Sequence, residues 1–317
     1  MALRTKTIEY AFPFSTASAA SAVARDFTSI TVYIPEASPT FRSVILECTA
    51  VDNVTTAASN SGIVMGISLG AVGRNDTTVT QTIANSGENQ GFIFIRDVTS
   101  YFTTNWTGTS MACGARLTVN GISTNNATAK LVITYQYDDT AATTRVKTVK
   151  IPMDGNNGNI TATLANMGGL ANQYPNLDTF LPESSKVYRD IFFETHGHTN
   201  SGSDNNGVIL NLRFDGATTL ASAIYEDQLQ SDRWFKRIDK LLGSVTTNAT
   251  HNVEVSVDNV ASNFPCLCGL LVVTYEYDHS ASTTIMNSLQ LPVLDEAGLI
   301  GGTATADESR YHRTISA

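Results

Sequence analysis

Hydrophobic and polar residues alternate in two stretches of the chain that lie 140 positions apart. In residues 131–138 (LVITYQYD) the odd positions are Leu, Ile, Tyr and Tyr, and the even positions are Val, Thr, Gln and Asp. Residues 271–278 (LVVTYEYD) repeat the pattern. Successive side chains of a strand point to opposite faces, so this period of two predicts a half-buried β-strand in each place.

Two further blocks repeat in the same order. They pair residues 34–42 (IPEASPTFR) with 181–189 (LPESSKVYR), and 62–65 (GIVM) with 207–210 (GVIL). Five residues after the first block, each half reaches a glutamate, Glu47 or Glu194. Three blocks in one order indicate an internal duplication.

Short strands separated by tight turns predict an all-β fold. Asn120-Gly121 suits a type I′ hairpin turn, and Asp258-Asn259 stands at the corresponding place in the second half. We therefore expect two tandem β-sandwich domains of jelly-roll or Ig-like type. One segment departs from this pattern: residues 232–242 carry apolar side chains at helical spacing between an Asp and a Gly, which predicts one short helix.

The repeat also suggests domain boundaries. We expect an N-terminal strand or arm at 1–29, sandwiches at 30–153 and 177–293, a linker at 154–176 and a C-terminal arm at 294–317. Three segments resemble one strand: residues 4–10, 145–151 and 285–291. An extra strand either completes its own sheet or pairs with an exposed edge of another subunit, so exchange of an end segment between subunits is one hypothesis.

Composition excludes several classes of function. The chain has 317 residues, a net charge of −9 and only 15% charged residues, with no basic run that could neutralise phosphates, which argues against nucleic-acid binding. No stretch has the length and hydropathy of a membrane span, and the N-terminus lacks the apolar core of a signal peptide. We expect synthesis in a cytoplasm and reduced cysteines.

The most chemical-looking stretch is residues 194–198 (ETHGH). In a strand, Glu194, His196 and His198 share a face and could hold a divalent metal. A Gly/Asn/Ser-rich segment follows, and the counterpart of this stretch in the first half has no histidine, so the entrance to a solvated loop is the better interpretation. We predict no metal, no cofactor and no catalytic residue.

Other candidates also have plainer interpretations. Asp138-Asp139 and Asp278-His279 end equivalent strands, where turn-forming aspartates are expected rather than a calcium site. Glu47 and Glu194 fall in separate units, so we expect that they do not converge as a pair of catalytic carboxylates. Trp106 and Trp234 could stack on a sugar, but tryptophans more often anchor a core or an interface.

The repeated Tyr-x-Tyr-Asp run, followed by Thr-Thr and then by Ile-Pro or Leu-Pro, resembles segments of structural proteins of tailed bacteriophages. The resemblance covers two short stretches. It implies a virion structural protein without enzymatic activity, most simply an auxiliary or decoration protein of the capsid. A major coat protein of double jelly-roll type and a carbohydrate-binding module of a fibre or tail are the alternatives. The implied partners are copies of itself, other virion proteins and a host-surface glycan, with no nucleic acid or membrane.

Overall fold

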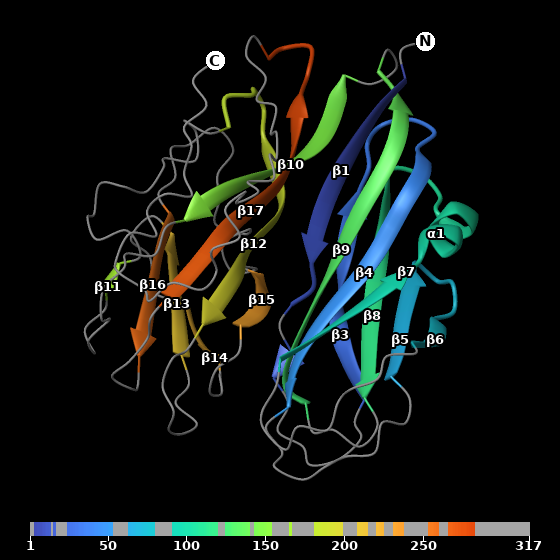
Figure 1. Ribbon diagram of the computed structural model, residues 1–317. Helices are drawn as coiled ribbons and strands as arrows, with labels where there is room; N and C mark the ends of the chain where they lie inside the picture. The colour runs from blue at the N-terminus through green and yellow to red at the C-terminus, as the bar shows by residue number, and fades with distance from the viewer. Residues whose placement is uncertain are drawn as a thin grey trace, which may run out of the picture.

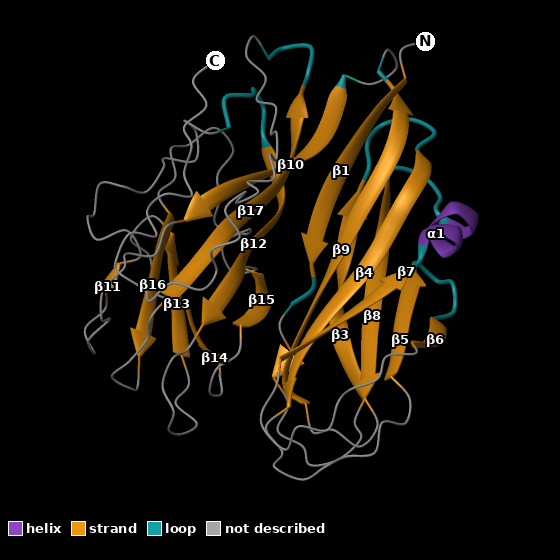
Figure 2. Cartoon of the chain, in the orientation of Figure 1, coloured by secondary structure: helices purple, strands orange, loops and turns teal. Residues whose placement is uncertain are grey.

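Strands dominate the computed structural model (Figures 1 and 2). The structure describes residues 3–13, 15–16, 24–52, 63–79, 91–119, 124–139, 143–153, 165–166, 181–198, 208–214, 220–224, 231–237, 253–259 and 266–282. These residues form four antiparallel sheets and one short helix. Two sheets make a first unit from the N-terminal half of the chain, and two make a second unit from the C-terminal half.

The first unit contains β1 to β9. Its inner sheet, which faces the second unit, has the order β1 (Leu3–Ala11), β9 (Thr124–Asp138), β4 (Thr40–Asp52) and β7 (Gly91–Asp97), and β2 (Ser15–Thr16) also pairs with β9. Its outer sheet has the order β3 (Ala24–Tyr33), β8 (Ser110–Val119), β5 (Ile63–Leu69) and β6 (Asn75–Val79).

The second unit contains β10 to β17. Its inner sheet has the order β10 (Thr144–Met153), β17 (Cys266–Asp278), β12 (Val187–His198) and β15 (Ser231–Arg237). Its outer sheet has the order β11 (Ala165–Asn166), β16 (Val253–Asn259), β13 (Val208–Phe214) and β14 (Leu220–Ile224).

Both units have the strand order of a jelly roll. If β2 is set aside and the eight remaining strands of each unit are numbered along the chain, strands 1 and 8, 2 and 7, 3 and 6, and 4 and 5 pair. These pairs are those of one long hairpin, and the additional pairs 8·3 and 7·4 roll that hairpin into two sheets. The β-sandwich prediction is confirmed, with the jelly-roll order in both halves. The repeated order is what an internal duplication predicts, and common origin remains a prediction.

The core of the first unit lies between its two sheets. As the alternation predicts, Leu131, Ile133 and Tyr135 face this core, while the even positions of β9 face the other way. Phe41, Phe102 and neighbouring aromatic rings close one end of it. The outward side chains of β9 and of its sheet neighbours are therefore the ones available to meet the second unit.

Strand pairing changes the predicted boundaries. Residues 3–11 form β1, which pairs with β9 of the same unit, so they complete their own sheet. Residues 144–153, expected in the first sandwich, form β10 and pair with β17 of the second unit. Within the expected linker, residues 165–166 form β11. The predicted C-terminal arm at 294–317 lies outside the described residues.

The predicted helix at 232–242 is wrong where the structure describes it. Residues 231–237 form β15, because seven consecutive positions of this segment pair with 192–198 of β12 and that ladder outweighs the helical spacing. The described part of the chain contains one helix, α1 (Thr99–Asn105), in the first unit. No helix among the described residues could span a membrane.

Candidate functional site

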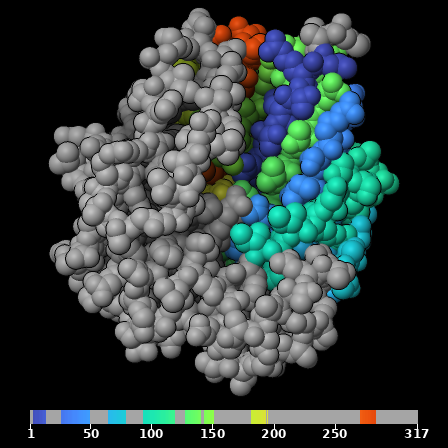
Figure 3. Space-filling view, in the orientation of Figure 1, coloured from blue at the N-terminus to red at the C-terminus, as the bar shows by residue number. Residues whose placement is uncertain are grey.

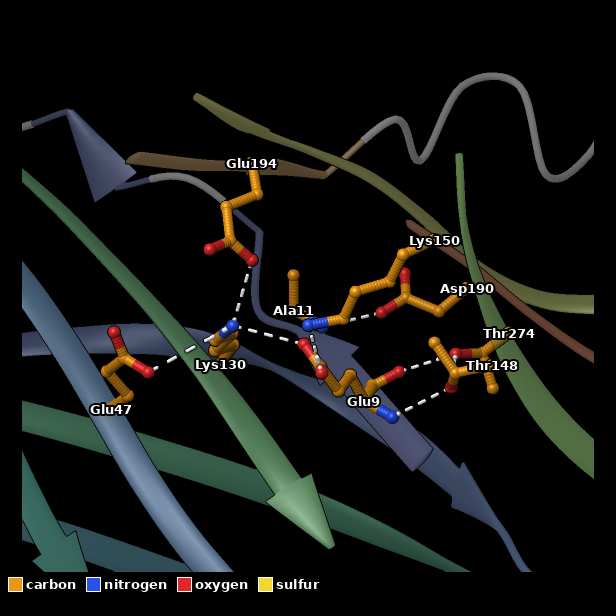
Figure 4. Close-up of polar contacts among 9 residues, drawn as sticks. All are labelled: Glu9, Ala11, Glu47, Lys130, Thr148, Lys150, Asp190, Glu194 and Thr274. Atoms are coloured by element: carbon orange, nitrogen blue, oxygen red, sulfur yellow. Dashed lines mark hydrogen bonds and ion pairs between the residues drawn. The ribbon is translucent and has the colours of Figure 1, made fainter. Parts of the chain in front are cut away.

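The free edge of β1 is covered by side chains of the second unit. β1 lies close to β10, β12 and β17. The Glu9 N–H donates to Thr148 Oγ1 at 2.9 Å, the Glu9 carbonyl accepts from Thr274 Oγ1 at 2.6 Å, and the Ala11 N–H donates to Asp190 at 2.5 Å (Figure 4). Unpaired edge groups normally attract another strand, and here this stretch of edge is already bonded.

A lysine and three carboxylates meet in the same interface. Lys130 of β9 is 1% exposed, and its Nζ lies 3.0 Å from Glu9, 3.0 Å from Glu194 and 4.0 Å from Glu47 (Figure 4). Lys150 of β10 contacts the other oxygen of Glu9 at 2.5 Å. Side chains from both units therefore compose one ionic cluster.

The cluster is enclosed. The side chains of Glu9, Glu47 and Glu194 are all less than a tenth exposed. Charges taken out of water cost free energy that only well-placed partners recover, so Glu194 of the second unit needs the ammonium of Lys130 on the first. An enclosed cluster of this kind has no room for a substrate, and its evident effect is to hold two sheets in one relative position.

The expectation that Glu47 and Glu194 stay apart is wrong. They occupy equivalent strands, β4 and β12, of the two units, and both reach the ammonium of Lys130. They converge because the outward faces of the two inner sheets pack against each other, which places outward-pointing residues of different units side by side. Sequence distance therefore misled the interpretation.

The suggested metal site is described only in part. Glu194 points to Lys130, and the side chains of His196 and His198 lie outside what the structure describes. Among the described side chains, no group of three or more His, Cys, Asp and Glu could hold a metal ion.

A second polar set occurs once in each unit. In the first unit, Glu36 accepts hydrogen bonds from Lys6 and from the Tyr135 hydroxyl. In the second, Glu183 accepts the same two bonds from the equivalent lysine and tyrosine. The partners in the second unit are Lys147 and Tyr275. The block at 34–42 and 181–189 supplies the glutamate, and the block at 131–138 and 271–278 supplies the tyrosine. The similar segments 4–10 and 145–151 supply the lysine, so residues far apart in the sequence meet at one place in each jelly roll.

Burial governs the protonation of this set. It lowers the pKa of Lys6 and of Lys147, against the opposing effect of the adjacent glutamate. It raises the pKa of Tyr135 and of Tyr275, and the adjacent glutamate raises both further. Each lysine also lies over tyrosine rings, with Lys6 Nζ 4.4 Å from the centre of the Tyr137 ring.

The set in the first unit also binds the start of the second. Glu36 accepts the N–H of Val146 at 3.1 Å, and Lys6 donates to the Val146 carbonyl at 2.5 Å. Val146 itself packs in the core of the first unit. The first strand of the second jelly roll is therefore anchored in the first jelly roll at a position where it also pairs with β17.

The two aspartate pairs differ in role. Asp278 accepts the N–H groups of Ser280 and Ala281, as expected of a turn-forming aspartate. Asp139 instead contacts two arginines, Arg4 at 2.7 Å and Arg145 at 2.6 Å. The carboxylate at the end of the first unit is thus held by the first strands of both units.

A groove of about 500 Å³ lies beside α1. Trp106 lines it, stacks on Phe102 and meets Phe41 edge-on. The half-buried Trp106 is therefore an anchor of the core end, as expected, and also presents part of its ring to the groove. Residues 36–41, Thr103, Gly108 and Thr109 form the rest of the wall. The side chain of Trp234 lies outside the described part.

Cys48 and Cys113 are free and buried, and burial raises the pKa of both thiols, so they are poor nucleophiles.

Sequence reasoning missed Lys130, although a signal was present. The repeated block begins at Leu131, and the residue just before it is lysine in the first half and leucine in the second. A charged residue in a strand whose neighbours are buried, at a place where two repeats diverge, indicates a specialised contact.

No protein-family model matches this sequence, and no curated protein sequence matches it. Among solved structures, it is similar to one of Sulfolobus turreted icosahedral virus, with 12% identity over 86% of this chain and 90% of that chain and a TM-score of 0.24. It is also similar to a structure of PNGF-II, with 11% identity over 90% of this chain and 67% of that chain and a TM-score of 0.26. For a structure of broad bean stain virus the identity is 11% over 84% of this chain and 92% of that chain, and the TM-score is 0.21. Scores this low establish neither a shared fold nor a shared function.

Proposed function

We propose that this chain is a structural protein of a virus particle, in which the two jelly rolls act as one rigid block of a protein shell. The observation that supports this proposal is the repeated jelly-roll order together with the buried polar interface between the units. Jelly rolls build many viral capsids and also lectin domains, so the proposal rests on architecture.

The architecture favours a coat protein of double jelly-roll type over a decoration protein. Closed shells form by repeating one fixed geometry, and a block with two loosely linked halves would not impose one. Here the edge of β1, the Lys130 cluster and the anchored Val146 all restrict movement between the halves. The tailed-bacteriophage resemblance and the decoration role remain predictions.

Sedimentation velocity and negative-stain microscopy of the purified chain test this proposal. We expect closed rings, tubes or shells of regular size, formed in a concentration-dependent way. A matched pair of variants sharpens the test. Ile95 on β7 is 57% exposed, an unusual exposure for isoleucine on a sheet face, and Ile95→Lys should weaken assembly. Thr77→Lys, at an exposed position of β6, should not. A chain that stays monomeric at every concentration and ionic strength contradicts the proposal.

The groove beside α1 supports a second candidate function, glycan binding. An aromatic ring flanked by hydroxyl groups suits a sugar, which offers an apolar face and polar edges, and Trp106 with Thr103 and Thr109 supplies both. A glycan array with the wild type and Trp106→Ala would test it, with Trp106→Phe as the variant that keeps a ring. Equal signals from all three exclude this groove.

A further inference from the structure

The Lys130 cluster has the composition of a self-modifying site. It combines a primary amine, a carboxyl group on the other unit and a second carboxylate, all enclosed in the interface (Figure 4). We propose that Lys130 and Glu194 condense to an isopeptide bond that joins the two jelly rolls covalently. The contact in this structure is that of the unreacted pair.

The geometry supplies the proximity that amide formation needs. Lys130 Nζ lies 3.0 Å from Glu194 Oε2. The carboxyl carbon, which the amine would attack, is bonded directly to this oxygen. Well-oriented groups reach effective concentrations on the order of 10⁵ to 10⁸ M, which lowers the barrier to amide formation. Both side chains are held by the packed sheets, and the Lys130 and Glu194 side chains are 1% and 3% exposed.

The reaction balances within the cluster. The Lys130 ammonium passes one proton to Glu194, which yields a neutral amine and a carboxylic acid. As the Nζ–Cδ bond forms, a second proton moves from nitrogen to Glu9 Oε2, which is also 3.0 Å away. Glu9 returns this proton to the departing hydroxyl, the Cδ–O bond breaks, and one water leaves. No oxidant, reductant or activating co-reactant is consumed.

Burial favours the product. Two charges held out of water carry a desolvation cost, and a neutral amide removes both charges while keeping a hydrogen-bonding group. Lys150, 2.5 Å from Glu9 Oε1, holds the proton-transferring carboxylate in place. Glu47, 4.0 Å from Lys130, adds a further negative charge to the cluster and is not needed for the proton transfer.

The molecule contains an internal control. Lys6 also meets a buried glutamate, Glu36, but the described groups that face this pair are Tyr135, Tyr137, the Val146 backbone and the cations Arg145 and Lys147. Because no second carboxylate among the described residues contacts the Lys6 amine to carry the proton, the Lys6–Glu36 pair should stay ionic. One buried pair should therefore be linked and the other free.

Intact-mass and peptide mass spectrometry of the full-length protein decide the proposal. We expect wild type to be lighter than its sequence by one water, and trypsin to leave Lys130 uncut, with peptide 117–145 joined to peptide 190–213. Lys130→Arg and Glu194→Ala should each have the full mass of their sequences, and Glu9→Gln should lower the linked fraction. Lys6→Arg should stay linked, and circular dichroism checks the folding of each variant.

If the measured mass of the wild-type protein equals the full mass of its sequence, the proposal is overturned, and this result does not depend on how any variant folds. A missing water that maps to other residues overturns it as well.

Discussion

At the scale of single residues, the interface depends on charges that have no access to water. Lys130 balances carboxylates from both units, and removing it would leave Glu9, Glu47 and Glu194 buried without their shared cation. Breaking a buried ionic group in this way usually costs more than the intact group contributes, because the remaining charges are uncompensated.

We therefore expect Lys130→Met to lower the free energy of unfolding by about 3 to 5 kcal/mol relative to protein in which Lys130 and Glu194 are still an ion pair. Urea denaturation followed by circular dichroism measures the change. Arg74→Ala is the matched control, because Arg74 pairs with Asp76 at the surface and such pairs contribute under about 1 kcal/mol. Equal effects of the two substitutions would contradict the assigned role of Lys130.

The buried tyrosines predict an alkaline transition. Burial raises the pKa of Tyr277 to about 12 and raises that of Tyr135 and Tyr275 as well. Between about pH 10 and 12 the folded state keeps the Tyr277 proton that the unfolded state has lost, so stability falls as pH rises. The lowered pKa values of Lys6 and Lys147 make stability rise with pH instead, and this effect is confined to pH values below 10.5.

Ultraviolet absorbance of phenolate, recorded together with circular dichroism, tests this transition. We expect the phenolate signal of the buried tyrosines to appear with the loss of folded structure, whereas the chain in urea should ionise its tyrosines near their ordinary pKa. Complete ionisation at pH 10 with the fold intact would show that the Tyr135 and Tyr275 hydroxyls are accessible.

At the scale of elements, β1 shows how a sheet edge can be covered without another strand. Alternate backbone groups of β1 pair with β9, and those on the other side bond to Thr148, Thr274 and Asp190. The equivalent of Ala11 in β10 is Pro152, which faces Leu270 as Ala11 faces Lys130. Proline has no N–H, so the second unit needs no acceptor at this position.

A double-mutant cycle tests this account of the edge. Asp190→Ala removes the acceptor of the Ala11 N–H and should destabilise the protein by about 1 to 3 kcal/mol. Ala11→Pro removes the donor, and proline occupies the equivalent position of β10. In the Ala11→Pro background the Asp190→Ala change should cost clearly less. Strictly additive effects in urea denaturation would mean that Asp190 acts through other contacts.

The sequence was sufficient to predict strands, their repetition and the sandwich class, because period-two alternation and repeated blocks are local signals. It was insufficient for β15, since seven residues can suit a helix or a strand and the ladder with β12 decides between them. The Thr-rich α1 has no apolar periodicity, and Asp97, which accepts the Thr99 N–H, helps to start it. The Lys130 cluster needed knowledge of which sheet faces meet, which strand patterns alone do not contain.

At the scale of the whole molecule, the contact between the two units of one chain cannot be repeated in the same form between separate copies of the protein. The second unit of one copy could bind the first unit of another copy in the same way only if each unit used the residues equivalent to those of the other. The second unit would then take the part that the first unit plays within one chain, and the first unit would take the part of the second. Ser43 takes the place of Asp190, and Pro152 that of Ala11, so one hydrogen bond is lost. The face that would be used carries Thr7 and Thr134, whose hydroxyl groups contact each other at an exposed place. The strands β1, β9 and β4 lie side by side on the visible surface of the first unit (Figure 3).

The charges differ as well. Leu270 takes the place of Lys130, Lys150 that of Glu9 and Glu47 that of Glu194, so a lysine shared by three carboxylates would not be reproduced. Buried charged and polar groups that lose their partners cost free energy, which the remaining threonine contacts would have to offset. The interface is therefore specific to the two units of one chain.

This specificity predicts that, in an assembly of this protein, the contact between the two units forms within each chain and not between chains. Isotopically light and heavy copies, mixed, assembled and cross-linked through their lysines, distinguish links within a copy from links between copies. Links between Lys6 and Lys150, whose side chains are 16% and 19% exposed, should all lie within one copy, and links between copies should map to other surfaces. Mixed light–heavy links between these lysines would show that the unit contact is exchanged between chains, and would restore strand exchange as the mode of assembly.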